Sequence, residues 1–77
     1  MAPKIAYYRQ QQQGKRVAIT KEVARKQGIK VNDYEEYFVD DKLHGQIVEF
    51  AEGRTWFVRL DIGHTIKIAS KSFTEVG

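Results

Sequence analysis

A stretch of alternating apolar and polar residues between Leu43 and Ser70 constrains the fold of this chain more than any other feature. Its clearest run is Thr55–Ile62, in which every second side chain is apolar. This period of two is typical of an antiparallel strand with one buried face. Breaks at Gly53 and Gly63 divide the stretch into three strands, so the sequence predicts a mainly β domain. The residues expected to fill its core are Trp56, Val58, Leu60, Ile66 and Ile68.

The flanking segments complete the predicted sheet. Tyr34–Val39 predicts a first strand, Asp40–Lys42 a turn, and Phe73–Val76 a short last strand. Before them, Thr20 is suited to cap a helix of about two turns that ends near Gly28. We therefore expect a short helix followed by five antiparallel strands.

Short strands and a small core favour closure of this sheet, because a closed sheet exposes no edges. The fold class expected is mainly β, with a short N-terminal helix followed by a five-stranded antiparallel SH3-like (Sm-like) barrel. A five-stranded OB barrel is the alternative if residues 4–19 supply strands. The domain organisation expected is an N-terminal arm over residues 1–19 and a helix-plus-barrel domain over residues 20–77.

The 77-residue chain has no cysteine, which excludes disulfides and thiolate metal sites. His44 and His64 do not have the spacing of zinc ligands. Small domains without these supports are commonly stabilised by oligomerisation, so we expect a homo-oligomer. No long apolar run and no signal-peptide core occur, and cytoplasmic localisation is expected.

No catalytic grouping is evident in the sequence. The serines and Thr74 have no histidine and aspartate placed as partners of a nucleophile, and no Gly-rich phosphate loop precedes a helix. Asp40 and Asp41, like Glu35 and Glu36, are better explained as a solvated turn and strand face than as a general acid and base. We expect no enzyme activity and no cofactor.

Charge is divided unevenly along the chain. Residues 1–31 contain eight Lys or Arg and one Glu, a net charge of +7. Residues 32–77 contain five Lys or Arg and nine Asp or Glu, a net charge of −4. Such asymmetry suggests nucleic-acid contact by the basic part. The alternative is that the basic arm of one subunit lies on the acidic face of the next.

Candidate nucleic-acid-binding residues follow from this asymmetry. The basic cluster on or beside the predicted helix consists of Lys15, Arg16, Lys21, Arg25, Lys26 and Lys30. Single-stranded nucleic acid also stacks its bases on aromatic rings, for which Tyr7, Tyr8 and Phe57 are candidates. Phe57 is more readily explained by burial at a subunit interface.

Two motifs resemble the Sm/Lsm family, and within it the Hfq arrangement. "YFVDDKLHGQIVEF" is similar to the stretch in which the first strand turns into the second, with Leu43 and Gly45 in register, and "IKIASKSFTEV" stands where the family's second motif stands. The resemblance implies an RNA-binding ring of identical subunits. Of the RNA-binding residues only Lys67 is carried over, because Ile66 and Ile68 replace the family's aromatic residue and histidine.

The same motifs more weakly resemble the plasmid-borne trimethoprim-resistant dihydrofolate reductase, a tetrameric SH3-like barrel. Its pore-lining strand carries a Gln-Ile-Tyr triplet, whereas this chain has Lys67-Ile68-Ala69. The reductase activity is therefore not expected here.

The function expected from the sequence is RNA or single-stranded nucleic-acid binding by a homo-oligomeric ring, mainly through contacts to phosphates. The alternative is a protein-interaction module, for instance a small phage-type or accessory protein, that uses its acidic surface and has no nucleic-acid role.

Overall fold

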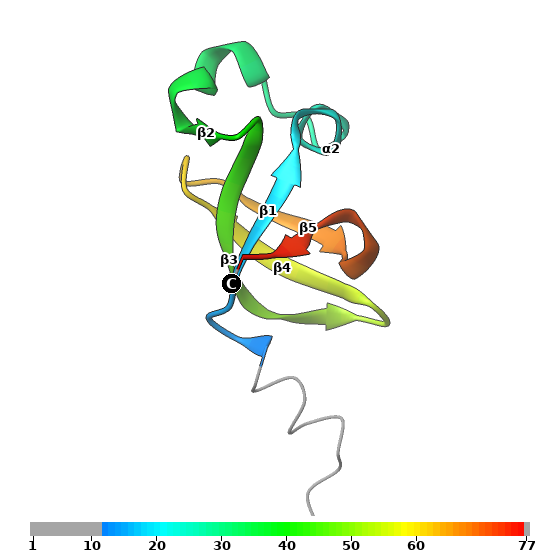
Figure 1. The fold of residues 1–77 in the computed structure, drawn as a ribbon. Helices are drawn as coiled ribbons and strands as arrows, with labels where there is room; N and C mark the ends of the chain where they lie inside the picture. Colours follow the sequence, from blue (N-terminus) through cyan, green and yellow to red (C-terminus); the bar gives the residue numbers. More distant parts are fainter. Residues whose placement is uncertain (1–11, 77) are drawn as a thin grey trace, which may run out of the picture.

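The computed structural model describes residues 12–76, in which six strands form one antiparallel sheet with a short helix packed beside it (Figure 1). The strand order is β5-β4-β3-β1-β6, and β2 pairs with β3 off this path. The strands are β1 (Arg16–Thr20), β2 (Phe38–Val39), β3 (Lys42–Glu52), β4 (Thr55–Leu60), β5 (Thr65–Ala69) and β6 (Thr74–Glu75). The helical segments are α2 (Lys21–Lys26) and the 3₁₀ helices η1 (Val31–Tyr37) and η2 (Ser70–Ser72).

Strand β3 organises the sheet because it pairs with three other strands. Its first half pairs with β1 and, at the hairpin, with β2, while β4 pairs along most of its length. The register with β4 shifts twice, between Ile47 and Glu49 and between Phe50 and Glu52. Such bulges bend a strand and increase its twist, and β3 curves visibly in Figure 1.

Gly45 allows β3 and β4 to approach closely. A Cβ atom at this position would lie 2.7 Å from the Arg59 carbonyl oxygen and 3.0 Å from the Leu60 Cα atom. Val17 of β1 is its register partner on the other side. The strand centre therefore requires a residue without a side chain.

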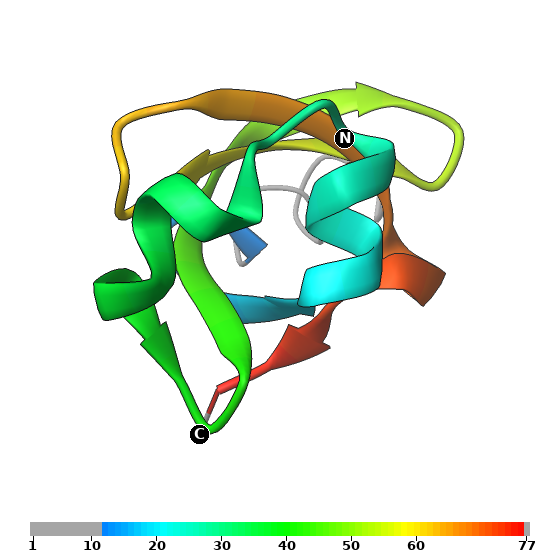
Figure 2. The same ribbon diagram turned by 90° about the horizontal axis from the view of Figure 1, so that it is seen from above.

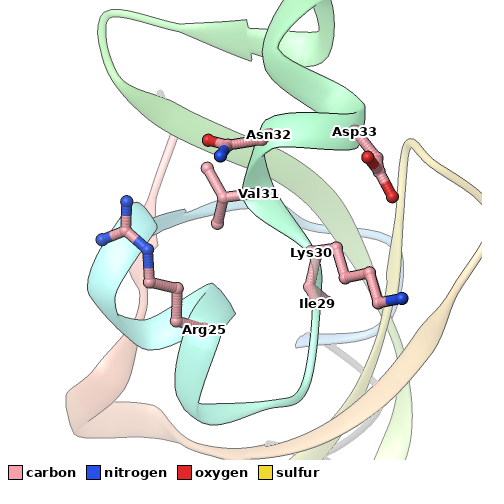
Figure 3. A pocket seen from close by; sticks show the side chains of 6 residues that line it. All are labelled: Arg25, Ile29, Lys30, Val31, Asn32 and Asp33. Carbon is pink, nitrogen blue, oxygen red and sulfur yellow. The ribbon is translucent and has the colours of Figure 1, made fainter.

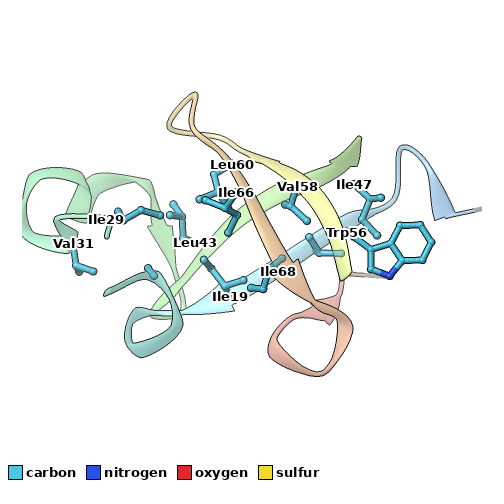
Figure 4. Close-up of a cluster of buried hydrophobic side chains, with 12 residues drawn as sticks. Ile19, Ile29, Val31, Leu43, Ile47, Trp56, Val58, Leu60, Ile66 and Ile68 are labelled. Atoms are coloured by element: carbon cyan, nitrogen blue, oxygen red, sulfur yellow. The ribbon is translucent and has the colours of Figure 1, made fainter. Parts of the chain in front are cut away.

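A single buried cluster fills the interior (Figure 4). It runs from Ile29 and Val31, beside η1, to Trp56 at the far end of the sheet. The five core residues predicted from the alternating pattern are all buried. The complete cluster is Val17, Ile19, Ala24, Ile29, Val31, Leu43, Ile47, Trp56, Val58, Leu60, Ile66 and Ile68.

Helix α2 has the termini that the sequence predicted. The Thr20 side chain accepts a hydrogen bond from the Val23 N–H at 3.2 Å, which caps the first turn. At the other end Gly28 has φ +83°, and the Ile29 N–H donates to the Ala24 carbonyl. This is a Schellman closure, and it directs the buried Ile29 side chain back into the core.

The predicted strand Tyr34–Val39 is wrong over most of its length, since only Phe38–Val39 is extended. Residues Val31–Tyr37 form η1 instead, which consists of two short 3₁₀ segments that meet at a kink at Tyr34, where φ is −129° and ψ is 23°. The Tyr34 and Tyr37 rings contact each other with centroids 6.1 Å apart. Tyr34 also contacts the ring of His64, with centroids 5.7 Å apart.

The mainly β, antiparallel character and the short helix on the N-terminal side of most strands are confirmed. One strand, β1, comes before the helix, so residues 16–19 of the expected arm belong to the sheet. Viewed from above, α2 and η1 lie together at one end of the strands (Figure 2). Within residues 12–76 the sheet is open, with β5 and β6 at its two ends. No helix in this range is long and apolar enough to cross a membrane.

Candidate nucleic-acid interface

The two cations at the start of β1 are held by acidic side chains. Lys15 forms an ion pair with Glu75 of β6 at 3.0 Å. The Arg16 guanidinium donates two hydrogen bonds to the Asp61 carboxylate, at 2.7 and 3.0 Å. These hydrogen bonds hold the pKa of Asp61 below its usual range and raise the pKa of Arg16. Both cations are therefore already paired with carboxylates of the same chain.

Two of the three predicted cations on α2 also have acidic neighbours. The Lys21 ammonium lies 3.6 Å from the Asp41 carboxylate and 5.6 Å from the centre of the Phe38 ring. Lys26 pairs with Glu22, one helical turn earlier, at 3.7 Å. These contacts are solvent-exposed and hold their partners weakly.

Lys67, the cation that the family resemblance singled out, lies on β5 far along the chain from this helix. Its ammonium contacts the Glu52 carboxylate at 2.5 Å, and this hydrogen bond lowers the pKa of Glu52. Phe57 is its register partner on β4 and is half-buried. The structure therefore places Lys67 on a different part of the sheet from the basic cluster.

Arg25 and Lys30 differ from the other predicted cations, because neither has an ion-pair partner among residues 12–76. Both are exposed, and both line a depression of about 390 Å³ between α2 and η1, the α2–η1 depression (Figure 3). In this view their charged groups lie on opposite sides of the connecting segment. Asn32 and Asp33 complete the polar lining, above the buried Ile29 and Val31.

Of the predicted nucleic-acid-binding residues, Arg25 and Lys30 thus line one depression, and the other described ones lie elsewhere or are paired with carboxylates. Four cations outside it, Lys42, Arg54, Arg59 and Lys71, also have no ion pair in the described range. The two predicted stacking residues Tyr7 and Tyr8 lie outside the described residues.

An aromatic group that the sequence pattern does not predict lies at the η1 end of the sheet. Tyr34 contacts both Tyr37 and His64 edge to face, with ring centroids 6.1 and 5.7 Å apart. The spacing of the two tyrosines by three residues was the signal for this contact, but it was interpreted as part of a strand. His64 belongs to the loop between β4 and β5, and no local pattern links it to Tyr34.

The carboxylates of residues 12–76 do not converge with histidines on one point, since no group of three or more such side chains in this range could hold a metal ion. Comparisons with protein-family models, with curated proteins and with solved structures gave no match. The role of the α2–η1 depression therefore follows from the charge, exposure and geometry of the residues that line it.

Proposed function

We propose that this protein binds RNA or single-stranded nucleic acid as a homo-oligomer, mainly through its phosphates, with Arg25 and Lys30 as contacts. The observation that supports the proposal is the α2–η1 depression. Two exposed cations without acidic partners in the described range line one concave surface there. A phosphate can bind at this surface without first displacing a carboxylate from either cation.

The two cations suit phosphate in different ways. An arginine guanidinium can donate two parallel hydrogen bonds to one phosphate, whereas a lysine ammonium acts as a compact charge. The Asn32 amide offers a further donor at the same surface. Asp33 lies on the same side of the connecting segment as Lys30 and opposes a phosphate placed beside it (Figure 3). The first phosphate is therefore expected beside Arg25 and Asn32, and Lys30 would contact a neighbouring phosphate of the same strand.

A single copy offers few such contacts, and we propose that assembly multiplies them. In this proposal a neighbouring copy completes a barrel of the SH3-like type, which is supported by the two open sheet edges, β5 and β6, that could pair with another chain. Several copies bound to one strand gain effective concentration, which increases avidity without any new contact. A sedimentation mass equal to that of a monomer at micromolar concentration would exclude the assembly.

Binding is tested by fluorescence anisotropy with a labelled oligouridine, measured from low to physiological salt. For single strands log K falls with log salt by about 0.7 for each phosphate contacted. We expect the double variant Arg25→Gln/Lys30→Gln to reduce this slope by about 1.4 for each bound copy.

The matched control is Lys15→Gln/Lys26→Gln, which removes the same charge from two cations that already hold carboxylates. Its slope should change less than that of the first variant. If no RNA or DNA oligomer binds even at low salt, the proposal is wrong, and the protein-interaction module remains. Equal effects of the two double variants would show that net charge, and not the α2–η1 depression, controls binding.

A further inference from the structure

The acidic residues of this chain fall into two groups that differ in their partners. All ten lie within residues 12–76, and five form ion pairs there. Four of the other five lie between Asp33 and Asp40, along η1 and the β2–β3 turn. We call this surface the acidic ridge, and it consists of Asp33, Glu35, Glu36, Tyr37, Val39, Asp40 and Asp41.

The ridge also exposes large apolar side chains. Tyr37 is 43% and Val39 57% exposed, although both adjoin Phe38, which packs against the core. The backbone at Phe38 is extended, so these two neighbours point to the same side, away from the core. Val39 further lines a depression of about 310 Å³ with Ala18 and with Val76, which is 41% exposed. The polar part of this lining is Asp40, Lys42, His44, Thr74 and Glu75.

The hairpin turn at Asp40 and Asp41 does not contain the residue pair that would make such a turn most stable. Val39 and Lys42 are register partners, so Asp40 and Asp41 form a two-residue hairpin turn. Their φ angles are +52° and +64°, the left-handed conformation for which Asn-Gly is the preferred pair. Two adjacent carboxylates at these positions add charge repulsion to backbone strain.

We propose that the acidic ridge is a docking site for an extended, lysine- or arginine-rich segment of a partner protein, with apolar residues between its cations. Charge complementarity identifies this occupant. No three carboxylates of the described residues converge on a point that could hold a metal ion, so a row of cations suits them better than a single ion. The apolar side chains of such a segment would cover Tyr37 and Val39 and the apolar part of the adjoining depression, at Ala18 and Val76.

The charge of the ridge excludes nucleic acid as its occupant. Residues 33–41 contain five carboxylates and no cation, and phosphates would be repelled. This inference does not rest on the proposed nucleic-acid binding, because the acidic ridge shares only Asp33 with the α2–η1 depression and attracts the opposite charge.

The test is fluorescence polarisation with a labelled Lys-Val-Lys-Val-Lys-Val-Lys peptide and the full chain. The informative variant is Asp40→Asn/Asp41→Gly, which installs the preferred turn pair and removes two charges. We expect it to weaken peptide binding about five- to tenfold, as two exposed charge contacts would. Its melting temperature should equal or exceed that of the original chain, so misfolding does not explain the loss.

The matched control is Glu49→Gln/Glu52→Gln, which removes two charges from the other end of β3. It should change peptide affinity less than about twofold, within the range typical of surface pairs. Val39→Ser tests the apolar contribution and should also weaken binding. Equal losses in the two double variants, or an unchanged affinity of the turn variant, would overturn the proposal.

Two further measurements separate this proposal from its competitors. Oligouridine should not displace the peptide, and Arg25→Gln/Lys30→Gln should not weaken peptide binding. Displacement would show that the ridge is not a separate site and would count against the proposal. If the turn variant instead changes the mass of the assembly in light scattering, the occupant is a second copy of this chain and the proposal fails.

Discussion

The β1–α2 segment, Lys15 to Lys30, and the acidic ridge, Asp33 to Asp41, are adjacent in sequence but use charge in opposite ways. In the first, four of six cations hold a carboxylate supplied by another part of the chain or by the helix itself. In the second, only Asp41 of five carboxylates has a cationic partner among residues 12–76, and its side chain is still 90% exposed. Most cations of the first region are therefore neutralised by carboxylates. Most carboxylates of the second region have no cationic partner among residues 12–76.

The two regions differ in packing as well. The β1–α2 segment contributes several side chains to the core, among them Ile19, which is 1% exposed, and the fully buried Ala24. Among the ridge residues, Val39 is exposed, and the rings that lie between them in sequence, Tyr34 and Phe38, are only partly buried against the core. Substitutions in the β1–α2 segment should therefore change the stability of the sheet strongly. Substitutions of the exposed ridge residues should change it little, so these side chains are available for binding.

The largest expected effect tests this difference in packing. Ile19→Ala should cost about 2–5 kcal/mol in the free energy of unfolding, because it leaves a cavity in the core. Val39→Ala on the ridge should change it by less than about 0.5 kcal/mol. Urea denaturation followed by the fluorescence of Trp56, the single tryptophan, measures both. A cost at Val39 comparable with that at Ile19 would show that the ridge is part of the core.

A second, smaller effect concerns β3, the strand that pairs with β1 of the first region and with β2 beside the ridge. Gly45→Ala should destabilise the fold by about 1–3 kcal/mol, because the new methyl group would overlap the β4 backbone. The same denaturation experiment applies, with Thr65→Ala on an exposed position of β5 as control. Equal stability of the Gly45 variant and the control would contradict the close approach of β3 and β4.

Much of the sheet could be predicted because its signals are local. The alternation in β4 specifies a buried face, and Thr20 and Gly28 specify the helix ends through backbone geometry that neighbouring residues determine. The conformation of Tyr34–Tyr37 was not predictable in the same way. A strand and a 3₁₀ helix both accept this composition, and the ring that packs on Tyr34, His64, lies some thirty positions later in the chain.

The candidate site was predicted less well, because charge pairing depends on register. Lys15 and Glu75 meet only because β6 pairs with β1. Arg16 meets Asp61, in the turn after β4, because β1 and β4 both pair with β3. Nothing in the sequence around Arg25 and Lys30 marks them as the cations left unpaired. Free charge is thus a property of the assembled sheet, and sequence alone overestimated the free positive charge of the first region.

The smallest expected effect tests the ion pair that best represents the neutralised region. The pKa of Asp61 is lowered in the folded state by the hydrogen bonds from Arg16, so the pair stabilises the fold above the usual aspartate range. This contribution is lost as the pH falls through the lowered pKa, because the carboxylate then becomes protonated in both states. At neutral pH Asp61→Asn should cost less than about 1 kcal/mol, since both side chains are substantially exposed. Denaturation midpoints across the acid range measure the difference, which should shrink in high salt; a difference that persists after protonation would show that packing, and not charge, holds Arg16 in place.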